Sequence, residues 1–194
     1  NSNTKIQRNC ENKKFMPPEK IKALPENIML NQELIQEAIC LGCTKAKVIL
    51  TKTISIANWM KLQCQYGCSQ YGSLLTCPPY TPDSEEMSEV LIEYDKALLI
   101  NASPEVNVRE IVVHLEKRLK DKGFSKAFGL SAKPCDLCDP CTIATNCQFP
   151  EKARPTLQAC GIDVNETISS NGWDDLGKQS PCTPTHAIGM VLMY

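Results

Sequence analysis

Short runs of β-branched and aliphatic residues are spaced along the chain at intervals that leave room for helices between them. Runs of this kind are typical of buried strands, and polar or Gly- and Pro-containing segments bound each of them. They predict strands at KVILTKTISI (47–56), KALLIN (96–101), FSKAFGL (124–130) and AIGMVLMY (187–194).

Between these runs the apolar residues return at the period of a helix. One such face predicts a helix that Asn31 caps and Gly42 ends, a second follows a cap at Thr81 and Pro82, and a third starts at Ser103–Pro104 and stops at Gly123. The apolar faces are Leu34, Ile35, Ala38 and Ile39; Met87, Val90, Leu91 and Tyr94; and Val108, Ile111, Val112, Leu115 and Leu119.

This alternation of strands and helices predicts an α/β fold with a small mixed sheet of about four strands and flanking helices. Two cysteine-rich segments, at 64–80 and 134–150, follow predicted strands. We expect part of the sheet to be parallel through right-handed crossovers, and the pattern does not fix the strand order. Residues 1–30 are polar and broken by Pro17, Pro18 and Pro25, so we expect an arm there and one domain over residues 31–194.

Composition narrows the class of protein. Hydrophobic residues make up 42% of the 194-residue chain and the net charge is −1, which predicts a folded protein without affinity for nucleic acid. No apolar run approaches the roughly 20 residues of a membrane span, and the N-terminal stretch lacks the apolar centre of a secretion signal. We therefore expect a cytoplasmic protein with no membrane contact, and the sequence leaves its oligomeric state open.

The chain contains twelve cysteines, and most of them are bunched. Disulfide frameworks are typical of chains too short to form a core, whereas this chain is long enough for one. The spacing therefore favours metal or cluster ligation over a disulfide framework.

The segment PCDLCDPCTIATNCQFP (134–150) has the most diagnostic spacing. Two residues separate Cys135 from Cys138 and Cys138 from Cys141, and Cys147 follows, which is similar to the thiolate run of a bacterial ferredoxin. Structural zinc is the alternative, but zinc sites usually join two separated Cys-x2-Cys pairs. Asp136 and Asp139 lie between the cysteines and predict a low reduction potential for a [4Fe-4S] cluster there.

The segment CQYGCSQYGSLLTCPPY (64–80) supplies Cys64, Cys68 and Cys77. Three thiolates leave one position of a four-iron cluster or of a tetrahedral zinc without a local ligand. Cys160 is our candidate for that position, and a buried apolar role for Cys160 is equally open. Cys77 and Cys147 could also each ligate the other cluster, as in two-cluster ferredoxins.

The other four cysteines carry weaker signals. We expect Cys40 and Cys43 to be core and helix-end thiols, although they show the Cys-x2-Cys spacing of a metal site. Cys10 and Cys182 stand alone, and we expect both to be loop residues.

Taken in order, CQYGCSQYGSLLTCPPYTP, EYDKALLI, PCDLCDPC and CQFPEKARPTLQACGIDV resemble the predicted metal-binding proteins of domain of unknown function twenty-two eighty-four. The resemblance runs over about residues 45–194. It implies an intracellular protein of anaerobic bacteria or archaea, to which no reaction is assigned. The ligand set that it implies is Cys64, Cys68, Cys77, Cys135, Cys138, Cys141 and Cys147, with Cys160 inside a family segment.

We expect an iron-sulfur protein that holds two [4Fe-4S] clusters and relays electrons to a redox partner protein. The first alternative is an enzyme whose cluster keeps one iron open for redox or Lewis-acid chemistry, with Tyr71 or Tyr80 as a proton donor. The second alternative is a zinc-stabilised interaction module.

Overall fold

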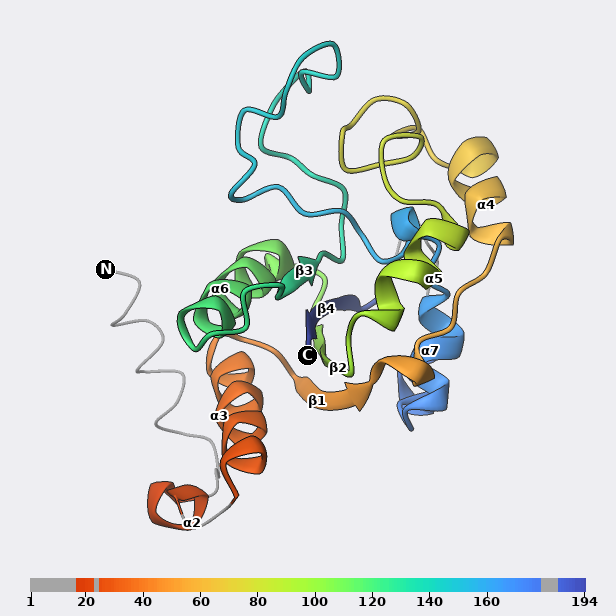
Figure 1. The fold of residues 1–194 in the computed structure, drawn as a ribbon. Coiled ribbons are helices and arrows are strands. Elements are labelled where there is room, and N and C mark those ends of the chain that lie inside the picture. The colour runs from red at the N-terminus through yellow and green to blue at the C-terminus, as the bar shows by residue number, and fades with distance from the viewer. Residues whose placement is uncertain (1–16, 23–24, 179–184) are drawn as a thin grey trace.

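A computed structural model describes residues 17–22, 25–178 and 185–194, and a four-stranded sheet lies at its centre (Figure 1). Its strands are β1 (Lys45–Leu50), β2 (Lys96–Ala102), β3 (Phe128–Leu130) and β4 (Ala187–Met193), in the spatial order β1-β2-β4-β3. The predicted α/β class with about four strands is confirmed. β1 and β3 are both shorter than predicted.

The expectation of a partly parallel sheet is wrong, because all three strand pairings are antiparallel. β2 and β3 do run in the same direction, since both are antiparallel to β4. β4 lies between them and takes the hydrogen bonds that a parallel pair would have made. A strand more than fifty residues further along the chain therefore decides the sheet type, and local patterns cannot reveal it.

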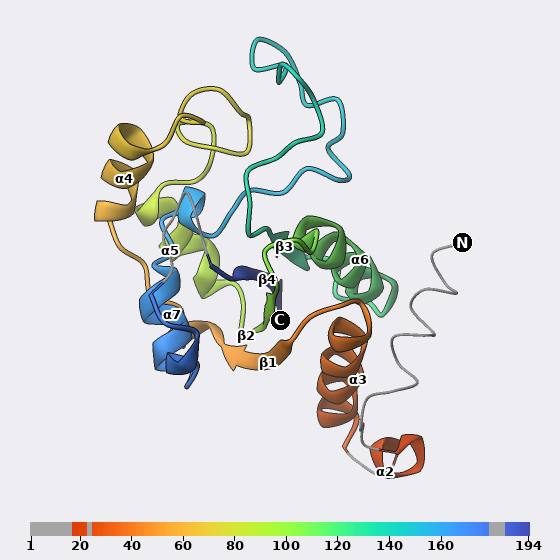
Figure 2. The same ribbon diagram turned by 180° about the vertical axis from the view of Figure 1, so that it is seen from behind.

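Helices cover both faces of the sheet (Figures 1 and 2). α3 (Glu26–Cys40) and α6 (Val108–Asp121) pack on one face, and α5 (Ser84–Ile92) and α7 (Val164–Ser170) pack on the other. Side chains of β2 alternate between the two cores: Leu99 contacts the α5 and α7 side, and Leu98 and Ile100 contact the α3 and α6 side. The sheet is buried on both faces, which explains its continuous apolar runs.

The three predicted helices exist but begin at other residues. α3 begins at Glu26, inside the segment expected to be an arm, so Asn31 lies within the helix and does not cap it. Asp83 caps α5 and shares a capping box with Glu86, and Asn107 caps α6. Asp83 and Asn107 are the capping residues because their side-chain oxygens accept hydrogen bonds from the free N–H groups of the first turn.

Three further helices were not predicted: α2 (Pro18–Lys22), α4 (Trp59–Gly67) and α7. The first cysteine segment therefore begins on a helix, which carries Cys64, and continues as a loop. Short 3-10 turns η1 (Thr51–Thr53), η2 (Gln158–Cys160) and η3 (Asp174–Leu176) complete the elements. None of the helices in the described part of the chain is long and apolar enough to cross a membrane.

Two glycines let α6 lie unusually close to the sheet. A Cβ on Gly189 of β4 would stand 2.4 Å from Val108 Cγ1, and one on Gly129 of β3 would stand 3.1 Å from Val112 Cβ. Both distances are shorter than a normal carbon contact, so side chains there would push the helix outward. The close packing fixes α6, which in turn holds the second cysteine segment.

Four cysteines lie outside the candidate ligand set, and the structure describes two of them. Cys43 is a buried cysteine just past the end of α3, as predicted. Cys40 is buried as well, but it is disulfide-bonded, so the expectation of a thiol there is wrong. Cys10 and Cys182 lie outside the described residues.

Candidate metal centre

The first three candidate ligands lie on α4 and the loop that follows it. Cys64 is on the last turns of α4, and Cys68 is the residue directly after the helix. Cys77 closes a turn in which its N–H donates to the carbonyl of Leu74 over 3.0 Å. Cys160 is far away in sequence but ends η2, which contacts α4.

These four cysteines gather into one set, called here the inner cysteine group: Cys64, Cys68, Cys77 and Cys160. Burial, together with the neighbouring Cys77 and Cys64 thiols whose thiolates would repel it, raises the pKa of Cys160 to about 12. Burial raises the pKa of Cys77 to about 12 as well, with Cys68 and Cys64 adding to the effect. Without a cation, these buried sulfurs are neutral thiols.

A small cavity of about 30 Å³ lies among Cys64, Cys68 and Cys77. The remaining wall consists of Tyr71, Pro78, Pro134, Thr156, Gln158 and Ala159. Tyr71 thus lies beside the thiols, whereas Tyr80 does not line this cavity. The space admits only one or two water molecules, so a cofactor of several atoms requires the loops around it to move apart.

The second segment forms an outer cysteine group: Cys135, Cys138, Cys141 and Cys147. All four are half-exposed and lie in a loop without helix or strand, whereas Cys77 and Cys160 of the inner group are buried. Desolvation raises the pKa of Cys138, and Cys141, Cys135 and Cys147 add to the shift. Cys138 is therefore close enough to the other three thiols for each of them to affect its pKa.

The two groups are neighbours. Cys135 of the outer group is among the thiols that raise the pKa of Cys77, after burial and the other inner thiols. Pro134, the residue before Cys135, also lines the inner cavity. The loops that carry the two groups project side by side from the same side of the molecule in both views (Figures 1 and 2).

Backbone hydrogen bonds close the base of the outer loop. The N–H of Ser131 donates to the carbonyl of Pro155 over 2.7 Å, and the N–H of Leu157 donates to the carbonyl of Ser131 over 3.3 Å. Ser131 directly follows β3, so the sheet supports the start of the loop. Cys135, Cys138, Cys141 and Cys147 therefore lie on a long loop whose two ends are hydrogen-bonded to each other.

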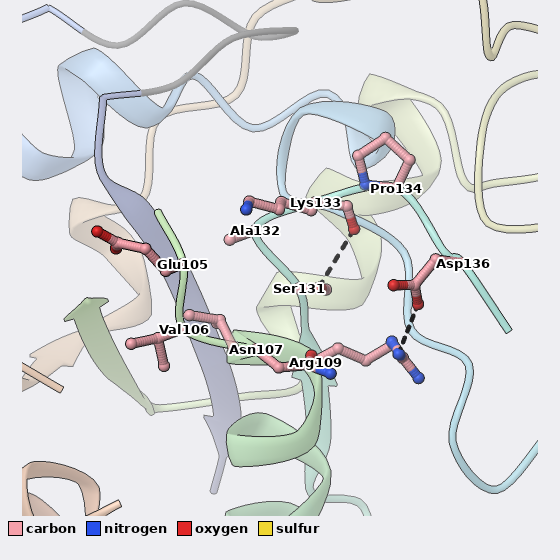
Figure 3. Close-up of a pocket in the computed structure, with 10 residues that line it drawn as sticks. Glu105, Val106, Asn107, Arg109, Ser131, Ala132, Lys133, Pro134 and Asp136 are labelled. Carbon is pink, nitrogen blue, oxygen red and sulfur yellow. Dashed lines mark hydrogen bonds and ion pairs between the residues drawn. The ribbon is translucent and has the colours of Figure 1, made fainter. Parts of the chain in front are cut away.

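Arg109 of α6 holds the first part of this loop. Its Nη2 donates to Asp136 Oδ1 over 2.6 Å, and the Arg109 side chain is 9% exposed (Figure 3). The two residues line a cavity of about 270 Å³ together with the first turn of α6 and the chain at Ser131–Pro134. Arg109 also offsets part of the negative charge that Asp136 places beside Cys135.

Glu116, two turns further along α6, holds the other end of the loop. It forms a bidentate ion pair with Arg154, and Arg154 Nη1 donates to the carbonyl of Pro150 over 3.0 Å. Burial works to raise the pKa of Glu116, but hydrogen bonds from Arg154, Lys120 and the Gly129 N–H outweigh burial and hold it below its ordinary value. The sequence analysis predicted neither the Arg109–Asp136 nor the Glu116–Arg154 ion pair. The signal for them was the presence of charged residues at positions 109 and 116, which share one helical face with the apolar Val112.

Within residues 17–22, 25–178 and 185–194, no group of three or more His, Cys, Asp or Glu side chains stands in an arrangement that could hold a metal ion. The donor chemistry nevertheless fits a thiolate-bound group, because each group supplies four sulfurs. Metal binding would deprotonate these thiols.

Comparison with known proteins agrees with this donor set. A family described as "Predicted metal-binding protein (DUF2284)" matches residues 47–193, which include all eight cysteines of the two groups. The chain belongs to this family. No curated protein and no solved structure matches it. Membership in DUF2284 supports metal binding by this chain.

Proposed function

We propose that the protein carries two [4Fe-4S] clusters, one on each cysteine group, and relays electrons between them and a partner enzyme. The observation that carries this proposal is the presence of two neighbouring sets of four thiols, with Cys135 close enough to influence Cys77. Four thiolates are the usual ligand set of such a cluster. When bound, the clusters would supply one-electron redox chemistry.

The proposed ligands of the inner cluster are Cys64, Cys68, Cys77 and Cys160. Cys160 supplies the fourth thiol, which favours complete ligation over the open site that an enzyme needs. Its low exposure of 1% and the influence of Cys77 and Cys64 on its pKa support this role. The proposed ligands of the outer cluster are Cys135, Cys138, Cys141 and Cys147, since Cys141, Cys135 and Cys147 all raise the pKa of Cys138.

The difference in exposure suggests a direction for the relay. The outer group is half-exposed on a projecting loop and can approach a partner protein, whereas Cys77 and Cys160 of the inner group are buried. Arg109 and Glu116 anchor the outer loop at its two ends, so little rearrangement would accompany electron transfer. We propose that the redox partner docks on the outer loop.

The proposal places the protein in a reducing compartment such as the cytoplasm, where thiols stay available as ligands. The disulfide at Cys40 counts against a reducing compartment. A count of free thiols on protein denatured directly from the producing cells decides between the two.

The ultraviolet-visible spectrum of anaerobically purified protein, before and after dithionite, tests the function. Two [4Fe-4S] clusters predict a broad band near roughly 400 nm that bleaches, with iron and sulfide each near about eight per chain. A colourless protein with stoichiometric zinc would replace the relay with a zinc-stabilised interaction module. Bound iron whose spectrum changes with a small-molecule substrate would favour the enzyme with an open iron.

A further inference from the structure

Thr76 carries a buried hydroxyl next to a proposed ligand. The residue is 8% exposed, and its Oγ1 is one of two buried side-chain oxygens in the described chain without a hydrogen-bond partner; the other is Asn101 Oδ1. Asn101 at least uses its amide nitrogen, which donates to Thr44 Oγ1 over 2.7 Å. A buried hydroxyl without any partner costs stability, so Thr76 calls for an explanation.

The backbone around Thr76 is fixed on both sides. The Cys77 N–H donates to the carbonyl of Leu74 over 3.0 Å, and the Gly72 N–H donates to the carbonyl of Pro78 over 2.8 Å. Leu74 is itself buried and anchors the turn. The hydroxyl is therefore held in a set place relative to the next residue, Cys77.

The sulfur of Cys77 is the acceptor that we consider for the Thr76 hydroxyl. Cys77 is the residue directly after Thr76 in this fixed turn, and the Thr76 hydroxyl has no hydrogen-bond partner among the described residues of the metal-free protein. A thiol sulfur is a weak acceptor, whereas a charged acceptor makes a shorter and stronger bond. The hydroxyl thus gains its partner when Cys77 becomes a metal-bound thiolate.

We propose that Thr76 Oγ1 donates a hydrogen bond to Cys77 Sγ once a metal or cluster binds the inner group, and that this bond raises the reduction potential of the inner cluster. The first part needs only a metal-bound thiolate, and the second rests on the proposed iron-sulfur function. Hydrogen bonds to cluster sulfurs offset negative charge, and the reduced cluster carries one more negative charge than the oxidised one. Thr76 is in this sense a positioning and tuning residue and not a ligand.

The test compares Thr76→Val, which removes the hydroxyl at nearly constant volume, with Thr76→Ser, which keeps it. Thr53→Val is the matched control, because it removes a hydroxyl on η1 that donates to the carbonyl of Leu50 over 2.7 Å. Iron and sulfide are assayed on every sample, and the clusters are titrated with dithionite and followed by electron paramagnetic resonance. We expect Thr76→Val to lower the reduced-to-oxidised ratio of one cluster about tenfold at a fixed potential, a shift of about 59 mV.

We expect Thr76→Ser and Thr53→Val to stay within about twofold of the unmodified ratio. An unchanged ratio in fully loaded Thr76→Val overturns the proposal, and so does an equal shift in Thr76→Ser. If Thr76→Val does not fold, the iron-sulfur stretching bands of the unmodified protein decide, because they should shift between H₂O and D₂O. Identical bands in the two solvents overturn the hydrogen bond.

A failure of the iron-sulfur function is recognised separately. If the unmodified protein binds no iron, the inner group is loaded with cobalt(II) alone and its sulfur-to-cobalt absorption is recorded. A shift of this band in Thr76→Val, with none in Thr76→Ser, supports the hydrogen bond while the relay fails. Equal bands in all variants, or no cobalt binding, overturn the Thr76 proposal as well.

Discussion

Arg154 and Glu116 form a bidentate ion pair, with Arg154 Nε 2.7 Å from Glu116 Oε2 and Nη2 2.8 Å from Oε1. The two side chains are 8% and 3% exposed, so the pair is buried. Glu116 also accepts the N–H of Gly129 over 2.8 Å, which ties α6 to β3 as well as to the end of the outer loop. One carboxylate thus joins the sheet, a helix and the cysteine segment.

Replacing this carboxylate should destabilise the protein strongly. Glu116→Gln leaves the guanidinium of Arg154 buried without a counter-charge, and breaking such a pair costs about 3–5 kcal/mol. We expect a loss of free energy of unfolding in this range, measured by urea denaturation of the metal-free protein. The matched control is Glu93→Gln, whose partner Lys126 is 2.9 Å away and whose side chain is 63% exposed. This exposed pair should contribute less than about 1 kcal/mol, and equal losses in both variants would refute the assignment.

The same pair predicts a pH dependence of stability. The folded-state pKa of Glu116 lies below the ordinary carboxyl value of 4.5, because the hydrogen bonds from Arg154, Lys120 and Gly129 outweigh burial. Stability from this group is therefore fully present above pH 4.5 and is lost as the pH falls through the lower folded value. Denaturation of the unmodified protein and Glu116→Gln between pH 7 and pH 3 should show curves that converge in acid. A gap that stays constant would contradict this prediction.

Sequence patterns predicted local structure well where the signal was local. The apolar stripe of α6 and the run of β2 were found because period and burial agree there. The insertion of β4 between β2 and β3 was missed, since it depends on contacts between distant segments. For the same reason, spacing could suggest Cys160 as a partner of Cys64, Cys68 and Cys77 only as one of several choices, and it is the contact of η2 with α4 that brings Cys160 near them.

The ion pair of Arg109 with Asp136 should control the mobility of the outer loop more than global stability. Asp136 is 76% exposed, so Asp136→Asn should cost less than about 1 kcal/mol of unfolding free energy. Losing the anchor should nevertheless speed amide hydrogen exchange over residues 132–138 about twofold to fivefold in the metal-free protein. Glu151→Gln, at the end of the same loop, is the control and should leave this exchange unchanged. Equal exchange in Asp136→Asn would mean that the backbone bonds at Ser131 suffice.

Gly161 sets the position of the inner group against α5. Its φ is +74°, and a Cβ there would stand 2.5 Å from Ser84 Oγ and 3.0 Å from Ser84 Cα. Gly172 has a similar φ of +78° but open space around it, so Gly172→Ala should pay only the backbone cost of about 1–2 kcal/mol. Gly161→Ala should lose about 1–3 kcal/mol more, because Ser84 has to move. Thermal or urea denaturation of the two variants measures the difference, and equal losses would show that the Ser84 contact relaxes without cost.

Cys160 and Cys43 offer a matched pair for testing the fourth ligand of the inner group. Both are 1% exposed, so replacement by alanine creates a similar small cavity at either site. Cys43 belongs to the core between α3 and the sheet and lies in neither cysteine group. Cys160→Ala should therefore reduce bound iron from about eight to about four per chain, while Cys43→Ala should keep about eight. The measurement is iron and sulfide content with the absorbance near roughly 400 nm on anaerobic protein of equal fold, checked by circular dichroism. Full iron in Cys160→Ala would mean that three thiolates are sufficient, and a cluster with one open iron would then make the enzyme the better explanation of the inner group.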